Sequence, residues 1–293
     1  MGGSQVEAVT SATAASTVRR MPEPGADLRV DTDLGAVAVR VLGRGRPTVL
    51  WHSMFVDGSS WARIAPMLLA GRQLLIVDGP GWGTSDRLRR AVRMADAVTA
   101  AARIVTELSP DAPVDWVGNA WGGHVGIELA ATRPRLVRTL VAMSAPIQPI
   151  SPGMRRQIRA LIPVLLVAGP VTPVQRAIAA GVLTDRSARD PGTVGVIADA
   201  LALAGRRSTA RTVRSFILNR VDIASLLPRI TAPTLFVAGD DRDEWTPEQA
   251  EAAARLVRDG RAVVVPGSRA LIPLEQPEAL ATVIRGFWET ASP

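Results

Sequence analysis

The sequence contains no cysteine, tyrosine or lysine, and all 34 of its basic residues are arginines. A catalytic thiolate, a Schiff-base amine and a phenolic acid are therefore excluded. Histidine is also scarce: His52 and His124 are the only two, too few for a histidine-based metal site. Acid–base chemistry must rely on carboxylates, these two imidazoles, hydroxyl groups or backbone amides. Neither a metal nor a cofactor is predicted.

Long apolar runs are missing as well. The longest candidate, 161–168, is interrupted by Pro163 and is shorter than the roughly 20 residues that span a bilayer. Residues 1–20 are small and polar and carry arginines at their end, the reverse of a secretory signal. We therefore expect a flexible N-terminal tail over 1–26 and a soluble, cytoplasmic protein with no membrane partner. Arginine without lysine is typical of a GC-rich genome, so a bacterium of that kind is the expected source.

The net charge of +7 is concentrated in one region. Residues 147–224 hold 11 arginines and four aspartates, and the rest of the chain is neutral overall. The arginines follow helical patterns without interleaved aromatic residues, so a nucleic-acid partner is not predicted. Solvated helix faces are the simplest explanation, and a lid that attracts anions is the alternative.

Apolar strands alternate with helical patterns along most of the chain. A hairpin is predicted at 28–41, buried strands at 48–52, 74–78, 114–117, 136–143, 233–238 and 262–265, and helices at 59–70, 92–108, 122–131, 247–257 and 277–290. This alternation predicts an α/β fold with a mostly parallel central sheet of about eight strands, flanked by helices. Residues 147–226 carry only helical patterns. The predicted domains are a core formed by 27–146 and 227–293, and a helical lid over 147–226.

The stretch Val117-Gly118-Asn119-Ala120-Trp121-Gly122-Gly123 runs from a strand through a glycine-flanked corner into a helix. Four further features accompany it: His52-Ser53 after a buried strand, the loop 78–83, the acidic loop 239–245, and the loop 266–277. Taken in this order, the chain from about residue 27 onward resembles the α/β-hydrolase superfamily. The resemblance implies that fold with an inserted lid, and in active members a serine activated by a histidine that a carboxylate holds.

The sequence departs from this pattern at two of the three catalytic positions. Ala120 stands where the family has its serine, and Ala270 where it has its histidine. Arg269 replaces the glycine that is usual before that histidine. The expected acid is Asp243, with Asp241 as a rival. We interpret the pair of changes as natural loss of covalent chemistry, with an engineered change as the alternative.

The resemblance also implies an oxyanion hole made of backbone N–H groups, here those of Met54 and Trp121. Backbone donors survive side-chain replacement, so a carbonyl could still be polarised without a nucleophile. His52 and Asp243 are the candidates for the remaining proton transfer. Each has an alternative role. In the family the histidine at the position of His52 commonly orders the oxyanion loop, and Asp243 could instead pair with Arg269. His124 is expected to pack under the sheet.

A further set of residues is predicted to contact substrate, although each has a structural alternative. Asp57 could cap a helix, and the tryptophans near the pocket could belong to the core instead of an aromatic-walled site. The predicted substrate-binding residues are Ser53, Phe55, Asp57, Asn119, Trp245 and Arg269.

Three functions fit these observations. The first is a non-hydrolytic enzyme that polarises a carbonyl substrate, expected to be polycyclic or polyketide-type, for cyclisation, Michael-type C–C bond formation, elimination or isomerisation. The second is a catalytically silent ligand-binding protein. The third is an esterase- or lactonase-type hydrolase in an inactivated form. A small molecule is the expected partner, and a homodimer is compatible with the sequence.

Overall fold

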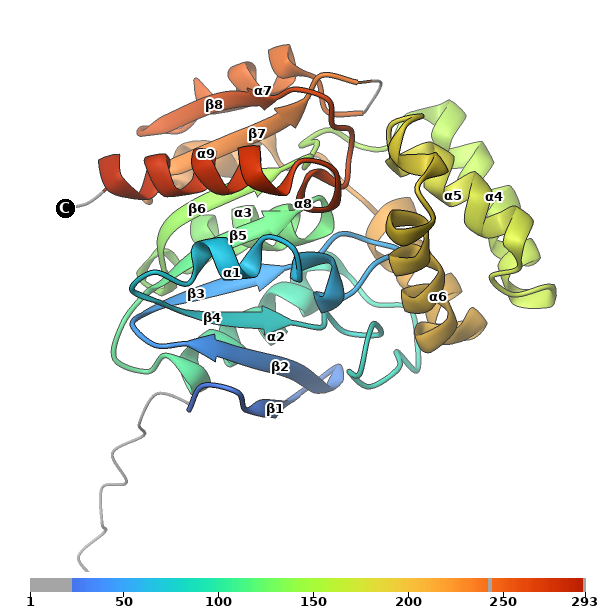
Figure 1. Ribbon diagram of the computed structural model, residues 1–293, viewed down its shortest axis with the longest axis horizontal. Helices are drawn as coiled ribbons and strands as arrows, with labels where there is room; N and C mark the ends of the chain where they lie inside the picture. Colours follow the sequence, from blue (N-terminus) through green and yellow to red (C-terminus); the bar gives the residue numbers. More distant parts are fainter. Residues whose placement is uncertain (1–22, 242–243, 292–293) are drawn as a thin grey trace, which may run out of the picture.

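The computed structural model describes residues 23–241 and 244–291. An eight-stranded sheet forms its centre, in the order β1-β2-β4-β3-β5-β6-β7-β8 (Figure 1). The strands are β1 (Asp27–Thr32), β2 (Gly35–Gly43), β3 (Arg46–Trp51), β4 (Arg72–Val77), β5 (Val114–Asn119), β6 (Val137–Met143), β7 (Thr234–Gly239) and β8 (Gly260–Val265).

Strands β3 to β8 pair in parallel, whereas β2 pairs antiparallel with both β1 and β4. The parallel strands β3, β4 and β5 are almost entirely buried, as their continuous apolar runs predict. The predicted hairpin forms the edge made by β1 and β2. The fold class expected from the sequence is therefore confirmed.

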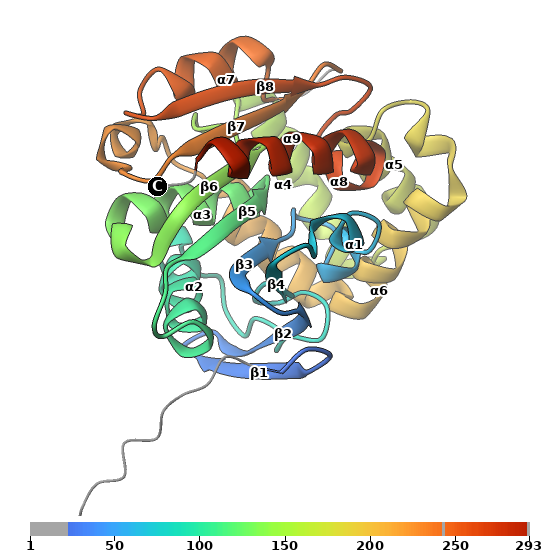
Figure 2. The same ribbon diagram turned by 60° about the vertical axis from the view of Figure 1, so that its left-hand side comes forward.

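Helices cover both faces of the sheet (Figure 1 and Figure 2). One face packs against α1 (Ala65–Leu68), α8 (Ile272–Glu275) and α9 (Pro277–Thr290), and the other against α2 (Met94–Leu108), α3 (Trp121–Thr132) and α7 (Pro247–Ala254). Two apolar clusters, one on each side of the sheet, form the core.

Between β6 and β7 the chain leaves the sheet and forms three longer helices, α4 (Pro152–Val167), α5 (Thr172–Val182) and α6 (Pro191–Thr212). They lie beyond the carboxyl ends of the parallel strands, at the right of Figure 1. Helix α6 is interrupted at Gly205, whose φ of 72° and ψ of 157° are not helical, so two helical segments meet there at a kink. A glycine accommodates this positive φ without steric strain.

One predicted helix differs in the structure. The stretch 59–70 is not a single helix, because it consists of a 3-10 turn, Gly58–Trp61, followed by the short α1. Pro66 lies at the start of α1, where its missing N–H is tolerated, and this position favours two short segments over one long helix. Within the described residues, none of the helices has the length and apolar character that crossing a membrane requires.

Candidate functional site

The corner between β5 and α3 is a strained turn. Ala120 has φ 46° and ψ −102°, a conformation that residues with a side chain rarely adopt. The two flanking glycines allow it: a Cβ on Gly118 would lie 2.1 Å from the carbonyl oxygen of Gly122, and one on Gly122 would lie 2.2 Å from that of Trp51. This strained strand-to-helix corner, which we call the elbow, resembles a nucleophile elbow in its geometry and has an alanine at its tip.

A cavity of about 390 Å³ opens beside Ala120, between the sheet and the lid. Its walls are mostly apolar, and they come from both parts of the chain. From the core they include Ser53, Met54, Phe55, Ala120, Trp121 and Ala270. From the lid they include Met154, Ile158, Leu161, Ile178, Val182 and Phe216.

Two backbone amides in this wall have no hydrogen-bond acceptor within the described part of the chain. Neither the Met54 nor the Trp121 N–H donates to any other described residue. Trp121 is the first residue of α3, so the positive end of that helix lies at the same wall. Phe55, next to Met54, also has a positive φ of 68°, which shows that the loop after β3 is tightly turned. The two residues predicted to supply the oxyanion hole therefore border the same cavity.

Ala270 borders this cavity as well, on a loop that is held from two sides. Its N–H donates to the Val182 carbonyl of the lid at 3.2 Å. Its own carbonyl accepts from the Asn119 side-chain amide at 2.8 Å. Asn119, predicted to bind substrate, is 2% exposed and is not among the cavity-lining residues. The structure corrects that prediction, because its amide fixes the Ala270 loop.

His52 is fully buried, and both ring nitrogens are engaged. Nδ1 donates to the Ser53 carbonyl at 2.6 Å, and Nε2 accepts from the Gly79 N–H at 2.8 Å. Burial lowers the pKa of His52, since the charged form is poorly solvated there. With no free nitrogen and no contact with the cavity, His52 orders the loops around the site. The prediction that it transfers protons is corrected accordingly.

Arg269 is 3% exposed and joins the core to the lid instead of facing substrate. Its Nη2 donates to Asp241 at 2.6 Å, and its Nη1 donates to the Ala180 carbonyl of α5 at 2.6 Å. The predicted substrate contact is therefore corrected. Asp243, predicted as a catalytic residue, lies outside the described residues, whereas its rival Asp241 is the carboxylate that holds Arg269.

Asp57 and Trp245 also have structural roles. An Asp57 carboxylate oxygen accepts from the Ser59 N–H at 2.9 Å and caps the turn that follows. Trp245 is fully buried and packs against Phe236, with ring centroids 6.1 Å apart. Neither is among the cavity-lining residues, so both predicted substrate contacts are corrected. Trp51, Trp61 and Trp82 are likewise buried in the core. Trp121 lines the cavity and stacks on Phe216, with ring centroids 4.6 Å apart.

The polar end of the cavity, formed by His124, Arg220 and Glu244, was not predicted from the sequence. Arg220 donates to one Glu244 carboxylate oxygen from both Nη atoms at 3.1 Å. His124 donates from Nε2 to the Pro146 carbonyl at 2.8 Å, which leaves Nδ1 as an acceptor. Burial, together with the charge of Arg220, lowers the pKa of His124 to about 4. His124 follows Ala120 by four residues and so shares its helix face, a spacing that could have identified it.

The comparisons with known proteins agree with this geometry. A model of the alpha/beta hydrolase family matches residues 48–283. The chain is similar to a 2-hydroxy-6-oxononadienedioate/2-hydroxy-6-oxononatrienedioate hydrolase of Escherichia coli, with 30% identity over 106 residues, 34% of this chain and 37% of the relative. A putative carbamate hydrolase of Stutzerimonas stutzeri is 36% identical over 136 residues, 43% of this chain and 47% of the relative. The chain thus matches less than half the length of these curated relatives.

Solved structures resemble almost the whole chain. A thermophilic esterase from Thermogutta terrifontis has a TM-score of 0.82 at 22% identity, covering 92% of this chain and 100% of its own. The enol-lactonase from Burkholderia xenovorans has a TM-score of 0.80 at 18% identity, covering 89% and 100%. At these identities the likeness concerns the fold alone. Because the family model extends from β3 into the last helix, the chain belongs to the alpha/beta hydrolase family.

Proposed function

We propose that this protein is a non-hydrolytic enzyme that polarises a carbonyl group of a small, largely apolar substrate. The observation that carries the proposal is the pair of unpartnered amides, Met54 and Trp121, in the wall of an apolar cavity beside Ala120. Donors aimed at one spot in a water-poor cavity stabilise a developing oxyanion by roughly 3 to 4 kcal/mol each in enzymes of known mechanism. An enolate is such an oxyanion, so the proposed reactions are cyclisation, Michael-type C–C bond formation, elimination or isomerisation.

The side chains at the two alanine positions support a reaction without a covalent intermediate. In our proposal Ala120 and Ala270 stand where active relatives have the nucleophile and its base. Neither methyl group can attack a carbonyl or transfer a proton. Both border the cavity, so the space that a serine and a histidine would fill is available to the substrate.

The shape and polarity of the cavity suggest the kind of substrate. Its volume of about 390 Å³ is at the small end of the range for ligand pockets, roughly 300 to 1,000 Å³. We propose a compact carbonyl compound with a second oxygen substituent, which Arg220 or the Nδ1 acceptor of His124 would bind. A polycyclic or polyketide-type skeleton remains a prediction from the sequence.

The proposed proton acceptor is Asp243, as the sequence predicts. His52 is unsuitable because neither ring nitrogen is free. His124 has a pKa of about 4, so it is a weak base near neutral pH and better suited to accept a hydrogen bond.

The oxyanion hole can be tested with p-nitrophenol, whose phenolate form is visible by absorbance. If the amides bind an oxyanion, the apparent pKa of the bound phenol falls by about one unit or more, equivalent to about 1.4 kcal/mol. The matched variants are Ala120→Asp and Ala120→Asn, since both residues tolerate a positive φ and differ by one charge. Ala120→Asp should lose the phenolate preference, and Ala120→Asn should retain most of it. Equal binding of phenol and phenolate by the wild type would contradict the proposal.

A hydrogen–deuterium exchange experiment on a carbonyl compound distinguishes catalysis from binding alone. In D₂O, the enzyme should accelerate deuterium incorporation beside the carbonyl of β-tetralone, measured by NMR. Ala120→Asp should abolish this acceleration, and Asp243→Asn should reduce it strongly. A protein that shifts the p-nitrophenol pKa without catalysing exchange is instead the silent binding protein.

An inactivated hydrolase is the second candidate, because the two relatives matched by sequence are called hydrolases. The double variant Ala120→Ser with Ala270→His tests it with p-nitrophenyl acetate. We expect little hydrolysis, because Arg269 occupies the Asp241 carboxylate that could orient a histidine at 270. Rapid ester turnover by the double variant would favour the hydrolase instead.

A further inference from the structure

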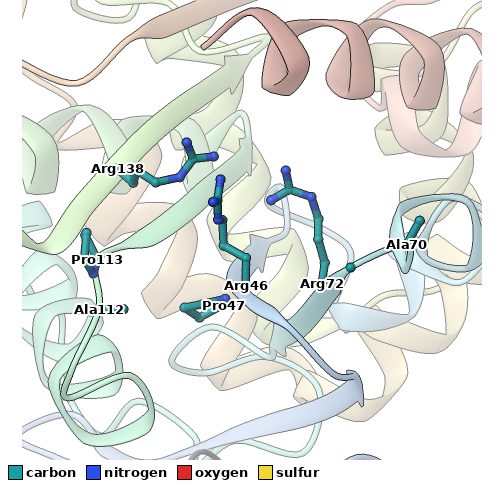
Figure 3. A pocket seen from close by; sticks show the side chains of 8 residues that line it. Arg46, Pro47, Ala70, Arg72, Ala112, Pro113 and Arg138 are labelled. Carbon is teal, nitrogen blue, oxygen red and sulfur yellow. The ribbon is translucent and has the colours of Figure 1, made fainter. Parts of the chain in front are cut away.

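A second pocket lies at the opposite end of the sheet from Ala120. It encloses about 520 Å³, and its lining includes three arginines, Arg46, Arg72 and Arg138. Arg46 begins β3, Arg72 begins β4 and Arg138 is the second residue of β6. Figure 3 shows the three guanidinium groups directed toward the same space. Since six strand residues span about 20 Å, this arginine pocket is separate from the cavity at the carboxyl ends.

The strand register forces two of these charges together. Arg46 and Arg72 are direct partners in the parallel pairing of β3 with β4, so their side chains project on the same side. Like charges in such positions repel each other. Burial lowers the pKa of Arg72, the Asp115 carboxylate raises it, and the charges of Arg138 and Arg46 lower it again.

One buried carboxylate pairs with two of the three arginines. Asp115 is fully buried and forms ion pairs with Arg72 and, at 2.6 Å, with Arg138. Arg46 is exposed, and its side chain forms no ion pair or hydrogen bond with a described residue. The lining that the structure describes contains no acidic side chain. Among the residues that the structure describes, the three arginines and Asp115 therefore leave about two positive charges without a counter-charge around this space.

The described residues satisfy the hydrogen-bond donors of Arg138 only in part. Its Nε and Nη2 are buried and lack a hydrogen-bond acceptor among the described residues, because the Asp115 ion pair does not have hydrogen-bond geometry. Its Nη1 makes only a long bond of 3.5 Å to the Ala291 carbonyl. Arg72, by contrast, is held rigidly over the Trp288 ring, 3.4 Å from its centroid. In this pocket, Arg72 is held by Asp115 and Trp288, and Arg138 has a weakly bonded Nη1. Arg46 is exposed and has no side-chain partner among the described residues.

We propose that the arginine pocket binds a phosphate dianion, either as inorganic phosphate or as the end group of a phosphate monoester. Two uncompensated positive charges match a dianion, and planar guanidinium groups bind phosphate oxygens through paired N–H donors. Arg46 supplies the free donors, and Nη1 of Arg138, whose hydrogen bond to the Ala291 carbonyl is long, supplies a further donor.

Calorimetric titration of the full chain with inorganic phosphate at low ionic strength tests this site. We expect saturable binding of one phosphate per chain. Arg46→Ala should weaken binding at least about tenfold, because it removes the arginine whose side chain has no partner among the described residues. The matched control is Arg44→Ala, which removes the same charge at a position two residues before Arg46. Arg44 lies outside the pocket and forms an exposed ion pair with Glu23. This variant should change the affinity less than about twofold.

Several results would overturn the proposal. Phosphate binding that does not saturate up to about 10 mM would do so, as would equal weakening of phosphate binding by Arg46→Ala and Arg44→Ala. Acetate binding as strongly as phosphate would also contradict it. Without phosphate, Arg44→Ala should unfold at the wild-type temperature and Arg46→Ala at or above it, because the second variant removes the repulsion with Arg72. As a second measurement, phosphate should raise the unfolding temperature of the wild type and of Arg44→Ala but not of Arg46→Ala. Tighter binding of methyl phosphate than of inorganic phosphate would identify a monoester as the occupant, and the reverse would identify the free ion.

Discussion

The side-chain amide of Asn119 donates to the carbonyl of Ala270 across 2.8 Å, which joins the residue before the elbow to the loop that closes the cavity. The same amide lies 3.5 Å from the Met143 carbonyl. Asn119→Leu keeps the approximate volume but leaves a buried carbonyl without its donor, at a cost of about 1 to 3 kcal/mol in the free energy of unfolding. Asn119→Asp should cost more, because a carboxylate would face two carbonyl oxygens. Urea unfolding measures both, and wild-type stability of Asn119→Asp would refute the role assigned to this bond.

His124 should make stability depend on pH. Its pKa is about 4 in the folded protein against an ordinary value of 6.5, so the unfolded chain takes up the proton first as pH falls. Stability should therefore be lost as the pH falls from 6.5 toward 4, by at most about 3 kcal/mol from this group. His52, whose pKa is also lowered, acts in the same direction.

His124→Gln isolates that contribution, since glutamine retains a donor for the Pro146 carbonyl but does not titrate. The loss of unfolding free energy between pH 6.5 and pH 4 should be smaller in the variant than in the wild type. Glu128, whose pKa burial raises to about 6, acts in the opposite direction in both proteins and cancels in the difference. Identical pH profiles would show that His124 is not the titrating group.

Arg269→Ala should loosen the lid. The substitution removes donors to Asp241 and to the Ala180 carbonyl, both at 2.6 Å, and leaves a buried space. The free energy of unfolding should fall by about 1 to 3 kcal/mol, and α5 should be cleaved faster by a protease. Arg255→Ala, which removes an exposed pair with Glu251, is the matched control and should change neither. Proteolysis of α5 at the wild-type rate in Arg269→Ala would contradict the anchoring role.

Two glycine-to-alanine variants should have opposite effects. In Gly118→Ala the new Cβ would lie 2.1 Å from the Gly122 carbonyl oxygen, so the elbow must shift at a cost of several kcal/mol, roughly 3 or more. In Gly153→Ala, at the start of α4, no atom lies within 4 Å of the new Cβ. This variant should gain about 0.4 to 1 kcal/mol in the free energy of unfolding, because alanine lowers the conformational entropy of the unfolded chain. Thermal unfolding of both variants checks this contrast, and similar values for the two would refute it.

The order of strands and helices could be predicted because each buried strand is a continuous apolar run and each helix repeats its apolar residues at helical spacing. The elbow could be located because its glycines are close in sequence. The partners that individual side chains contact were harder to predict. Asn119 and Arg269 are each engaged by a partner more than 80 residues away, which the sequence does not reveal. Asp57, by contrast, caps a turn through Ser59, two residues away, a local role that the sequence does suggest. His124 was misjudged because its position under the lid depends on how 147–226 folds back over the sheet.

The loop that carries Ala270 is bonded to α5 through Ala270 to Val182 and through Arg269 to Ala180. Any outward movement of α5 that admits a ligand must break these bonds or carry the loop with it. The wall formed by α5 and the wall formed by Ala270 are thus mechanically linked, so the space beside Ala120 changes shape whenever α5 moves. Association and release of a ligand should consequently share one conformational barrier, and variants that weaken either bond should accelerate both rates together.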